Sequence, residues 1–174
     1  MGDAGLQSAL VALDLAIQTE RDGREFYLRA AARSTDGAGK VLFLSLADDE
    51  LQHLQMLESQ RQALASEGQW LPPTKRDEEK LPKEVEGAPL FSRERLAENV
   101  GAYTSDLSAL RLAFLIEKDA VAFYTSAAAE TEDPIGRKVY ETLVEMEKEH
   151  QRILEQEYNA LAKEFWATMG FEPF

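Results

Sequence analysis

The two halves of this chain repeat one another without a gap, and this internal repeat limits the folds that are open to it. Glu20 corresponds to Glu117 and His53 to His150, in both cases at a separation of 97 positions. The same separation relates Phe26-Tyr27 to Phe123-Tyr124, Ala30–Ala32 to Ala127–Ala129, Glu50 to Glu147 and Leu57 to Leu154. A repeat of this kind indicates that each half builds the same supersecondary unit.

Each unit is predicted to be a pair of helices. Apolar residues recur at three and four positions over long stretches, and no stretch shows the sustained alternation of a strand. We expect one helix over residues 6–34 and, after a break at 35–39, a second to residue 66. In the second half, Thr104–Asp106 offers N-cap residues for a helix to 131, and Asp133-Pro134 for a helix to 169.

A long crossover is predicted between the two helix pairs. Residues 67–103 contain Pro72, Pro73, Pro82 and Pro89, with room for one short helix near 93–99. Two antiparallel hairpins joined by one long connection describe an all-α four-helix bundle. We therefore expect residues 1–174 to form a single domain, with helix pairs at 6–66 and 104–169.

Charge and cysteine content exclude several classes of function. The formal net charge is −13, so a basic face for nucleic acid or for an anionic membrane is hard to assemble. Apolar runs such as 112–116 are too short to span a bilayer. The absence of cysteine excludes disulfides, thiol nucleophiles and thiolate metal sites. Because residues 1–5 show no basic segment leading into an apolar one, we expect a cytoplasmic protein.

The chain has only two histidines, and each follows a glutamate by three positions. The two motifs are Glu50-Leu-Gln-His53 and Glu147-Lys-Glu-His150. Residues three apart lie on the same face of a helix, so each pair can present a carboxylate and an imidazole to a single ion. A lone motif of this kind on an exposed helix is usually solvated surface, but here both occupy equivalent places in the repeat.

Six ligand-type residues interrupt stripes that are otherwise apolar or aromatic. The predicted inward stripes are Leu10, Leu13, Ile17, Glu20 and Tyr27; Phe43, Leu46, Glu50, His53, Leu57 and Leu64; Leu107, Leu110, Phe114, Glu117, Val121 and Tyr124; and Tyr140, Leu143, Glu147, His150, Leu154 and Leu161. Four buried carboxylates repel one another and are costly to bury unpaired. Two divalent cations would balance them, and two neutral imidazoles would complete the coordination. Oxygen and nitrogen donors without sulfur favour iron or manganese, with zinc or cobalt also possible.

A structural bundle without metal is the competing hypothesis. In it, the inward acids pair with Arg24, Arg111 or Lys118, and chelation costs little stability. Tyr27 and Tyr124 lie two turns beyond Glu20 and Glu117, where they can pack in the core, hydrogen-bond a ligand carboxylate or act as redox-active neighbours. The glutamates off the inward stripes are predicted to be solvated: Glu25, Glu58, Glu130, Glu145, Glu149 and Glu155.

These residues together resemble the ferritin-like di-iron carboxylate proteins, which take a Glu from each of two helices and a Glu-x-x-His from each of the other two. Within that group the chain is most similar to rubrerythrin-type proteins that lack a rubredoxin domain. The likeness is carried by Ala16–Glu20 with Phe26-Tyr27, Ala47–His53, Ile116-Glu117 with Phe123-Tyr124, and Glu147–His150.

The resemblance implies a role for each residue of the site. Glu20 and Glu117 would be terminal ligands, Glu50 and Glu147 would bridge two iron ions, and His53 and His150 would each complete one iron. Through the metals these six residues would act catalytically, with Tyr27 and Tyr124 around them. Proteins of this group reduce hydrogen peroxide or dioxygen, or oxidise ferrous iron.

Two departures from the rubrerythrin pattern bear on activity. Rubrerythrins carry an additional glutamate one turn after the ligand of the third helix, where this chain has Ala120. They also carry a Cys-ligated relay iron, so electrons here would come from an external donor. A non-catalytic iron-binding or iron-handling protein is the alternative function. The resemblance further implies a homodimer, and the long crossover would permit exchange of helices between subunits.

Overall fold

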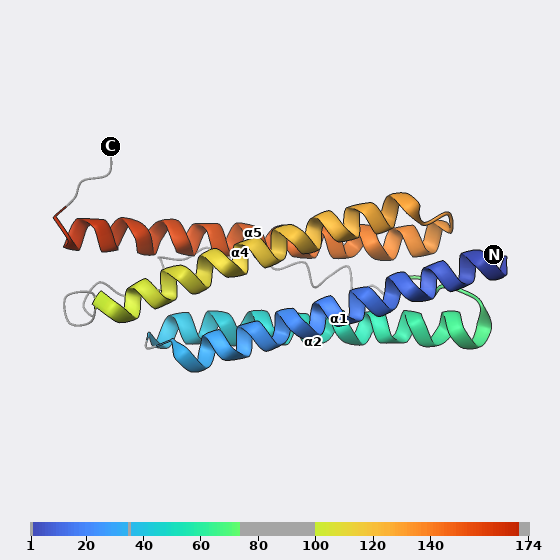
Figure 1. The fold of residues 1–174 in the computed structure, drawn as a ribbon, viewed down its shortest axis with the longest axis horizontal. Helices are drawn as coiled ribbons and strands as arrows, with labels where there is room; N and C mark the ends of the chain where they lie inside the picture. Colours follow the sequence, from blue (N-terminus) through green and yellow to red (C-terminus); the bar gives the residue numbers. More distant parts are fainter. Residues whose placement is uncertain (1, 35, 74–99, 171–174) are drawn as a thin grey trace.

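The computed structural model describes residues 2–34, 36–73 and 100–170, and within these ranges it is built from helices. The helices are α1 (Asp3–Arg33), α2 (Gly37–Glu67), α4 (Val100–Glu130) and α5 (Pro134–Thr168). α1 and α2 form one antiparallel hairpin, and α4 and α5 form a second that lies along the first (Figure 1). The all-α prediction is therefore confirmed. None of the helices in the described ranges is long and apolar enough to cross a membrane.

Side-chain caps start the second helix of each hairpin. Asp36 accepts hydrogen bonds from the backbone N–H groups of Ala38 and Gly39, both at 2.9 Å. Asp133 does the same for Ile135 and Gly136, and Pro134 occupies the first turn of α5 as predicted. α2 ends at Gly68, whose φ of 67° is the left-handed conformation that glycine adopts without strain. The turns that separate the helices are thus built from local sequence signals.

The predicted start of the third helix was wrong. α4 already includes residue 100, so Thr104–Asp106 lies within the helix and not at its N-terminus. Asp106 is buried, and burial raises its pKa to about 6, with the neighbouring Ser34 hydroxyl acting against the rise and the charge of Asp36 adding to it. Its side chain therefore belongs to the α1–α2 turn rather than to the end of its own helix. The short helix expected at 93–99 lies outside the described residues.

The apolar core is divided into two clusters, one on each side of the predicted ligands along the bundle axis. One cluster includes Leu13, Leu57, Tyr124 and Leu143, and the other includes Tyr27, Phe43, Leu46, Leu110 and Leu154. All the predicted inward residues of α2 and α5 are buried. Leu10 of α1 and Leu107, Phe114 and Val121 of α4 are only half-buried, so these two helices present a narrower apolar face than predicted.

Trp70 connects the first hairpin to the second. Its ring is buried, packs edge-on against Tyr140, and covers Gly136 in the first turn of α5. Gln60 holds this segment in place, because its side chain both donates to the carbonyl of Leu71 and accepts from its N–H, each at 2.9 Å. The start of the predicted crossover is therefore part of the packed core.

Gly136→Ala should destabilise the protein by about 1–3 kcal/mol, the usual cost of overpacking a core. A Cβ at this position would lie 2.5 Å from Cε2 of Trp70, so the indole or α5 must move. Urea unfolding followed by circular dichroism measures the effect. Gly37→Ala is the matched control in the first turn of α2, since a Cβ there meets nothing within 4 Å. Equal unfolding midpoints for Gly136→Ala and wild type would contradict this account of Trp70.

Candidate metal centre

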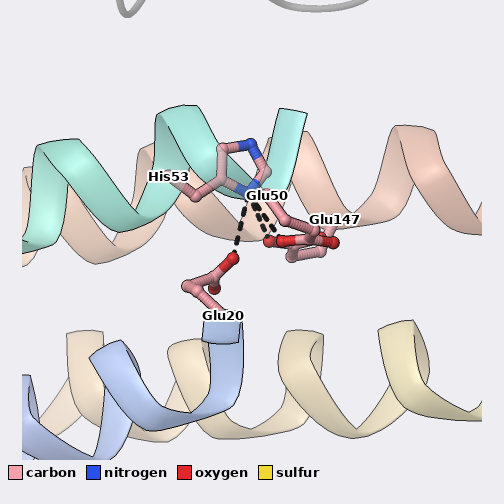
Figure 2. A group of neighbouring side chains, drawn as sticks. All are labelled: Glu20, Glu50, His53 and Glu147. Carbon is pink, nitrogen blue, oxygen red and sulfur yellow. Dashed lines mark hydrogen bonds and ion pairs between the residues drawn. The ribbon is translucent and has the colours of Figure 1, made fainter. Parts of the chain in front are cut away.

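All four described helices contribute to one buried polar cluster between the two apolar core clusters. α1 supplies Glu20, α2 supplies Glu50 and His53, α4 supplies Glu117, and α5 supplies Glu147 and His150. Each of these six residues is at most 5% exposed. Figure 2 shows Glu20, Glu50, His53 and Glu147 converging from their helices on a common point. The six predicted ligands are therefore brought together in space.

The imidazoles face the carboxylates with the same nitrogen. Nδ1 of His53 lies 3.0 Å from Glu147, 3.3 Å from Glu20 and 3.4 Å from Glu50. Nδ1 of His150 lies 3.0 Å from Glu147 and 3.6 Å from both Glu50 and Glu117. The two rings stack with their centroids 5.4 Å apart. The Glu-x-x-His motifs of α2 and α5 thus present their glutamate and histidine on the same side of the helix, as the spacing of three residues predicts.

The potential ligand atoms form two groups that share two residues. Glu20, Glu50, His53 and Glu147 make one group, and Glu50, Glu117, Glu147 and His150 make the other. Within each group the ligand atoms all lie within 4.8 Å of one another. Glu50 and Glu147 are the residues common to both groups. Two adjacent cation sites with two shared carboxylates is the arrangement that this geometry allows.

The cluster has the chemistry of a cation site rather than of a hydrogen-bonded network. Both carboxylate oxygens of Glu147 and Nδ1 of His150 are buried without a hydrogen bond, although Oε1 lies 3.0 Å from Nδ1 of His53 and Oε2 lies 3.0 Å from Nδ1 of His150. Buried polar atoms left in this way are rare and call for a partner. Oxygen and imidazole donors suit iron, manganese or zinc. The residues present therefore fit a pair of divalent metal ions.

Burial and neighbouring charges shift the pKa values of the clustered glutamates in different directions. Burial raises the pKa of Glu50 well above its usual range, and the charges of Glu147 and Glu20 add to the rise. Burial likewise raises the pKa of Glu117 to about 7. Burial alone would also raise the pKa of Glu147, but the positive charge of His53 and the nearby His150 outweigh it and hold that pKa well below its usual range.

The two histidines respond in the opposite direction to burial. Burial would lower the pKa of His53, but the charge of Glu147 and the close approach of the Glu147, Glu20 and Glu50 carboxylates raise it well above its usual range. His150 shows the same balance, with burial opposed by its carboxylate neighbours. In the absence of a cation the cluster therefore holds protons to reduce its internal repulsion, and these are the protons that a metal would displace.

Tyr27 and Tyr124 hold the outer glutamates from the opposite hairpin. The hydroxyl of Tyr27, on α1, donates to Glu117 of α4, and the hydroxyl of Tyr124, on α4, donates to Glu20 of α1. Both rings are fully buried. Two of the three roles predicted for these tyrosines, core packing and hydrogen bonding to an inward glutamate, are thus both present.

The competing ion-pair hypothesis finds no support in the described ranges. No ion pair there joins Arg24, Arg111 or Lys118 to the four inward glutamates, and the Arg111 guanidinium instead lies over the ring of Phe114. Of the glutamates predicted to be solvated, Glu149 is half-buried beside Arg152, and the others are exposed: Glu25, Glu58, Glu130, Glu145 and Glu155.

Asp49 is a neighbour of the cluster that the sequence analysis did not predict. Its Oδ2 lies 3.7 Å from Nε2 of His150, on the far side of the ring from the glutamates. The available signal was weak, because Asp49 belongs to no inward stripe and is only half-buried. Its position directly before Glu50 was the sole indication.

The family-model comparison agrees with this geometry. The rubrerythrin family model matches residues 12–158, which include most of both hairpins and all six clustered residues. The chain therefore belongs to the rubrerythrin family, and its helices form a ferritin-like four-helix bundle. No curated protein and no solved structure matches the chain.

Proposed function

We propose that this rubrerythrin-family protein is a di-iron oxidoreductase that reduces hydrogen peroxide or dioxygen, or oxidises ferrous iron, at a carboxylate-bridged site. The observation that carries the proposal is the sharing of Glu50 and Glu147 by the two ligand groups. In this assignment Glu50 and Glu147 would be shared by both ions, Glu20 and His53 would complete one position, and Glu117 and His150 would complete the other. When bound, the iron pair supplies two electrons by cycling between the ferrous and ferric states.

Three features of the site and its surroundings favour the binding of metal ions. The Tyr27 and Tyr124 hydroxyls fix the rotamers of Glu117 and Glu20, so the outer carboxylates are oriented before an ion arrives. The two apolar clusters pack on either side of the site along the bundle axis and exclude water from it. Four carboxylates balance two divalent ions, which makes the ferrous pair the electrically neutral state in a buried site.

The residues of this sequence suggest how electrons would be supplied for the reduction of peroxide or dioxygen. The sequence contains no cysteine for a thiolate relay iron, and position 120, where rubrerythrins have a further glutamate, is a buried alanine. We therefore propose an external electron donor. A non-catalytic iron-handling protein would share the same ligand geometry, so turnover is what separates the two functions.

Anaerobic loading with ferrous iron, followed by stopped-flow mixing with peroxide or with air-saturated buffer, tests the proposal. We expect two irons per chain and rapid oxidation by at least one of the two oxidants. Faster oxidation by peroxide would indicate a peroxidase, and the reverse an oxidase or ferroxidase. Single oxidation without turnover in the presence of reductants, with ready release of iron to a chelator, would favour iron handling. A protein that binds no iron would overturn the proposal.

A further inference from the structure

The two histidines differ in what lies behind them. Nδ1 of His150 faces the glutamates, while its Nε2 lies 3.7 Å from Oδ2 of Asp49. The other carboxylate oxygen of Asp49 accepts a long hydrogen bond of 3.5 Å from Gln52, one turn further along α2. The His150 side chain is 1% exposed and that of Asp49 37% exposed, so the carboxylate closes the site on its outer side. The ring of His150 therefore lies between the glutamates on one side and the Asp49 carboxylate on the other.

His53 has no equivalent support. Its Nδ1 also faces the glutamates, but no carboxylate lies against its Nε2 anywhere in residues 2–34, 36–73 and 100–170. The repeat explains the difference, because the position that corresponds to Asp49 in the second half is Met146. Met146 is buried and apolar, and its thioether is a weak acceptor. The ligand set is thus symmetric, whereas the residues behind it are not.

We propose that Asp49 is a positioning residue for His150 and makes the two metal positions unequal, so that the Glu117–His150 position binds its ion more tightly than the Glu20–His53 position. A carboxylate that accepts the second N–H of a metal-bound imidazole fixes the ring orientation and increases its basicity. Its negative charge would also attract a cation held by His150. This inference rests on the proposed function only in so far as the six clustered residues bind metal.

Cobalt(II) titration of the metal-free protein, followed by d–d absorption and calorimetry, tests the inequality. We expect two phases of one ion each, with His53→Ala deleting the weaker phase only. Loss of an outer carboxylate of this kind weakens metal binding roughly 10–100-fold. Because Asp49 is half-exposed, we expect Asp49→Met to weaken the tighter phase by about tenfold and to leave the weaker phase unchanged. Met146→Asp should strengthen the weaker phase.

Two controls separate positioning from general effects. Asp48→Met removes the same charge from the adjacent exposed position, which also receives a hydrogen bond from Gln52, and should leave both phases as in wild type. Asp49→Glu should restore part of the tighter phase. In the proton spectrum of the cobalt-loaded protein, the shifted N–H signal of His150 should exchange slowly with solvent in wild type and rapidly in Asp49→Met.

The outcomes distinguish this inference from the function on which it rests. If cobalt binds in two phases that Asp49→Met and Asp48→Met change equally, or not at all, the positioning role is wrong and the metal site stands. If wild type binds no cobalt or iron, both the site and the inference are overturned.

Discussion

Glu147→Ala should abolish binding of both iron ions, whereas Glu20→Ala should abolish binding of only one. Glu147 belongs to both ligand groups, and its two oxygens lie 3.0 Å from the two imidazoles, one on each side. Glu20 belongs to a single group. Metal analysis after anaerobic loading and desalting should therefore give two irons per chain for wild type, about one for Glu20→Ala and none for Glu147→Ala.

Glu145→Ala is the matched control for this experiment. Glu145 lies two residues before Glu147 on the exposed face of α5, where it pairs with Lys148 at 2.8 Å. Its removal changes the net charge of the chain by the same amount, and we expect full loading. Retention of one or more tightly bound irons by Glu147→Ala would show that this residue does not bridge.

Removing the metal should make the protein progressively less stable as the pH rises from 5 to 8. The pKa of Glu117 is raised from 4.5 to about 7, so ionising this buried group in the folded state costs about 3 kcal/mol, fully present above pH 7. Glu50 acts in the same direction because its pKa is also raised. The raised pKa values of His53 and His150 stabilise the fold below pH 6.5, and this contribution is lost as the pH rises through them.

Glu147 does not oppose this trend within the same window. Its pKa is lowered, so its stabilising contribution is present above pH 4.5 and is lost only in stronger acid. Metal loading requires the ionised glutamates and neutral imidazoles that high pH favours, and ligand at about 100 times its Kd adds about 2.7 kcal/mol per site. The loaded and metal-free proteins should therefore differ more in Tm at pH 8 than at pH 6.

Thermal unfolding with excess chelator and with ferrous iron under argon, at pH 6 and pH 8, measures this difference. Glu117→Gln cannot ionise at that position and should flatten part of the pH dependence of the metal-free protein. A Tm difference that is constant or smaller at pH 8 would mean that the cluster does not hold the protons assigned to it.

The elements that could be predicted from sequence are those specified by local pattern. The separation of 97 positions placed Glu20, Glu50, Glu117 and Glu147 on equivalent faces, and the spacing of three placed a histidine beside two of them. The cap at Asp133 and the left-handed glycine after α2 are likewise local features. Helix caps and the spacing of three residues depend on neighbours within one or two helical turns. They can therefore be recognised in the sequence without knowledge of the tertiary structure.

The features that could not be predicted depend on contacts between distant segments. Asp106 has a typical capping side chain, but burial beside Ser34 and Asp36 decides its role, so the start of α4 was misplaced. Trp70 follows the end of α2 in a stretch that shows no helical period, and its burial depends on the space that Gly136 leaves on α5. Asp49 touches His150 across 101 positions, a relation that no spacing rule within one helix reveals.

The crossed hydrogen bonds, from Tyr27 to Glu117 and from Tyr124 to Glu20, have a consequence for the ancestry of the fold. Each half of the chain carries one outer glutamate, one Glu-x-x-His and one tyrosine directed at the other half, so a single ancestral hairpin could have built this centre as a symmetric dimer. Duplication and fusion would then have freed the halves to diverge. The two halves now differ at equivalent positions of the repeat. Asp49 corresponds to the buried Met146, and the buried Phe43 corresponds to the buried Tyr140.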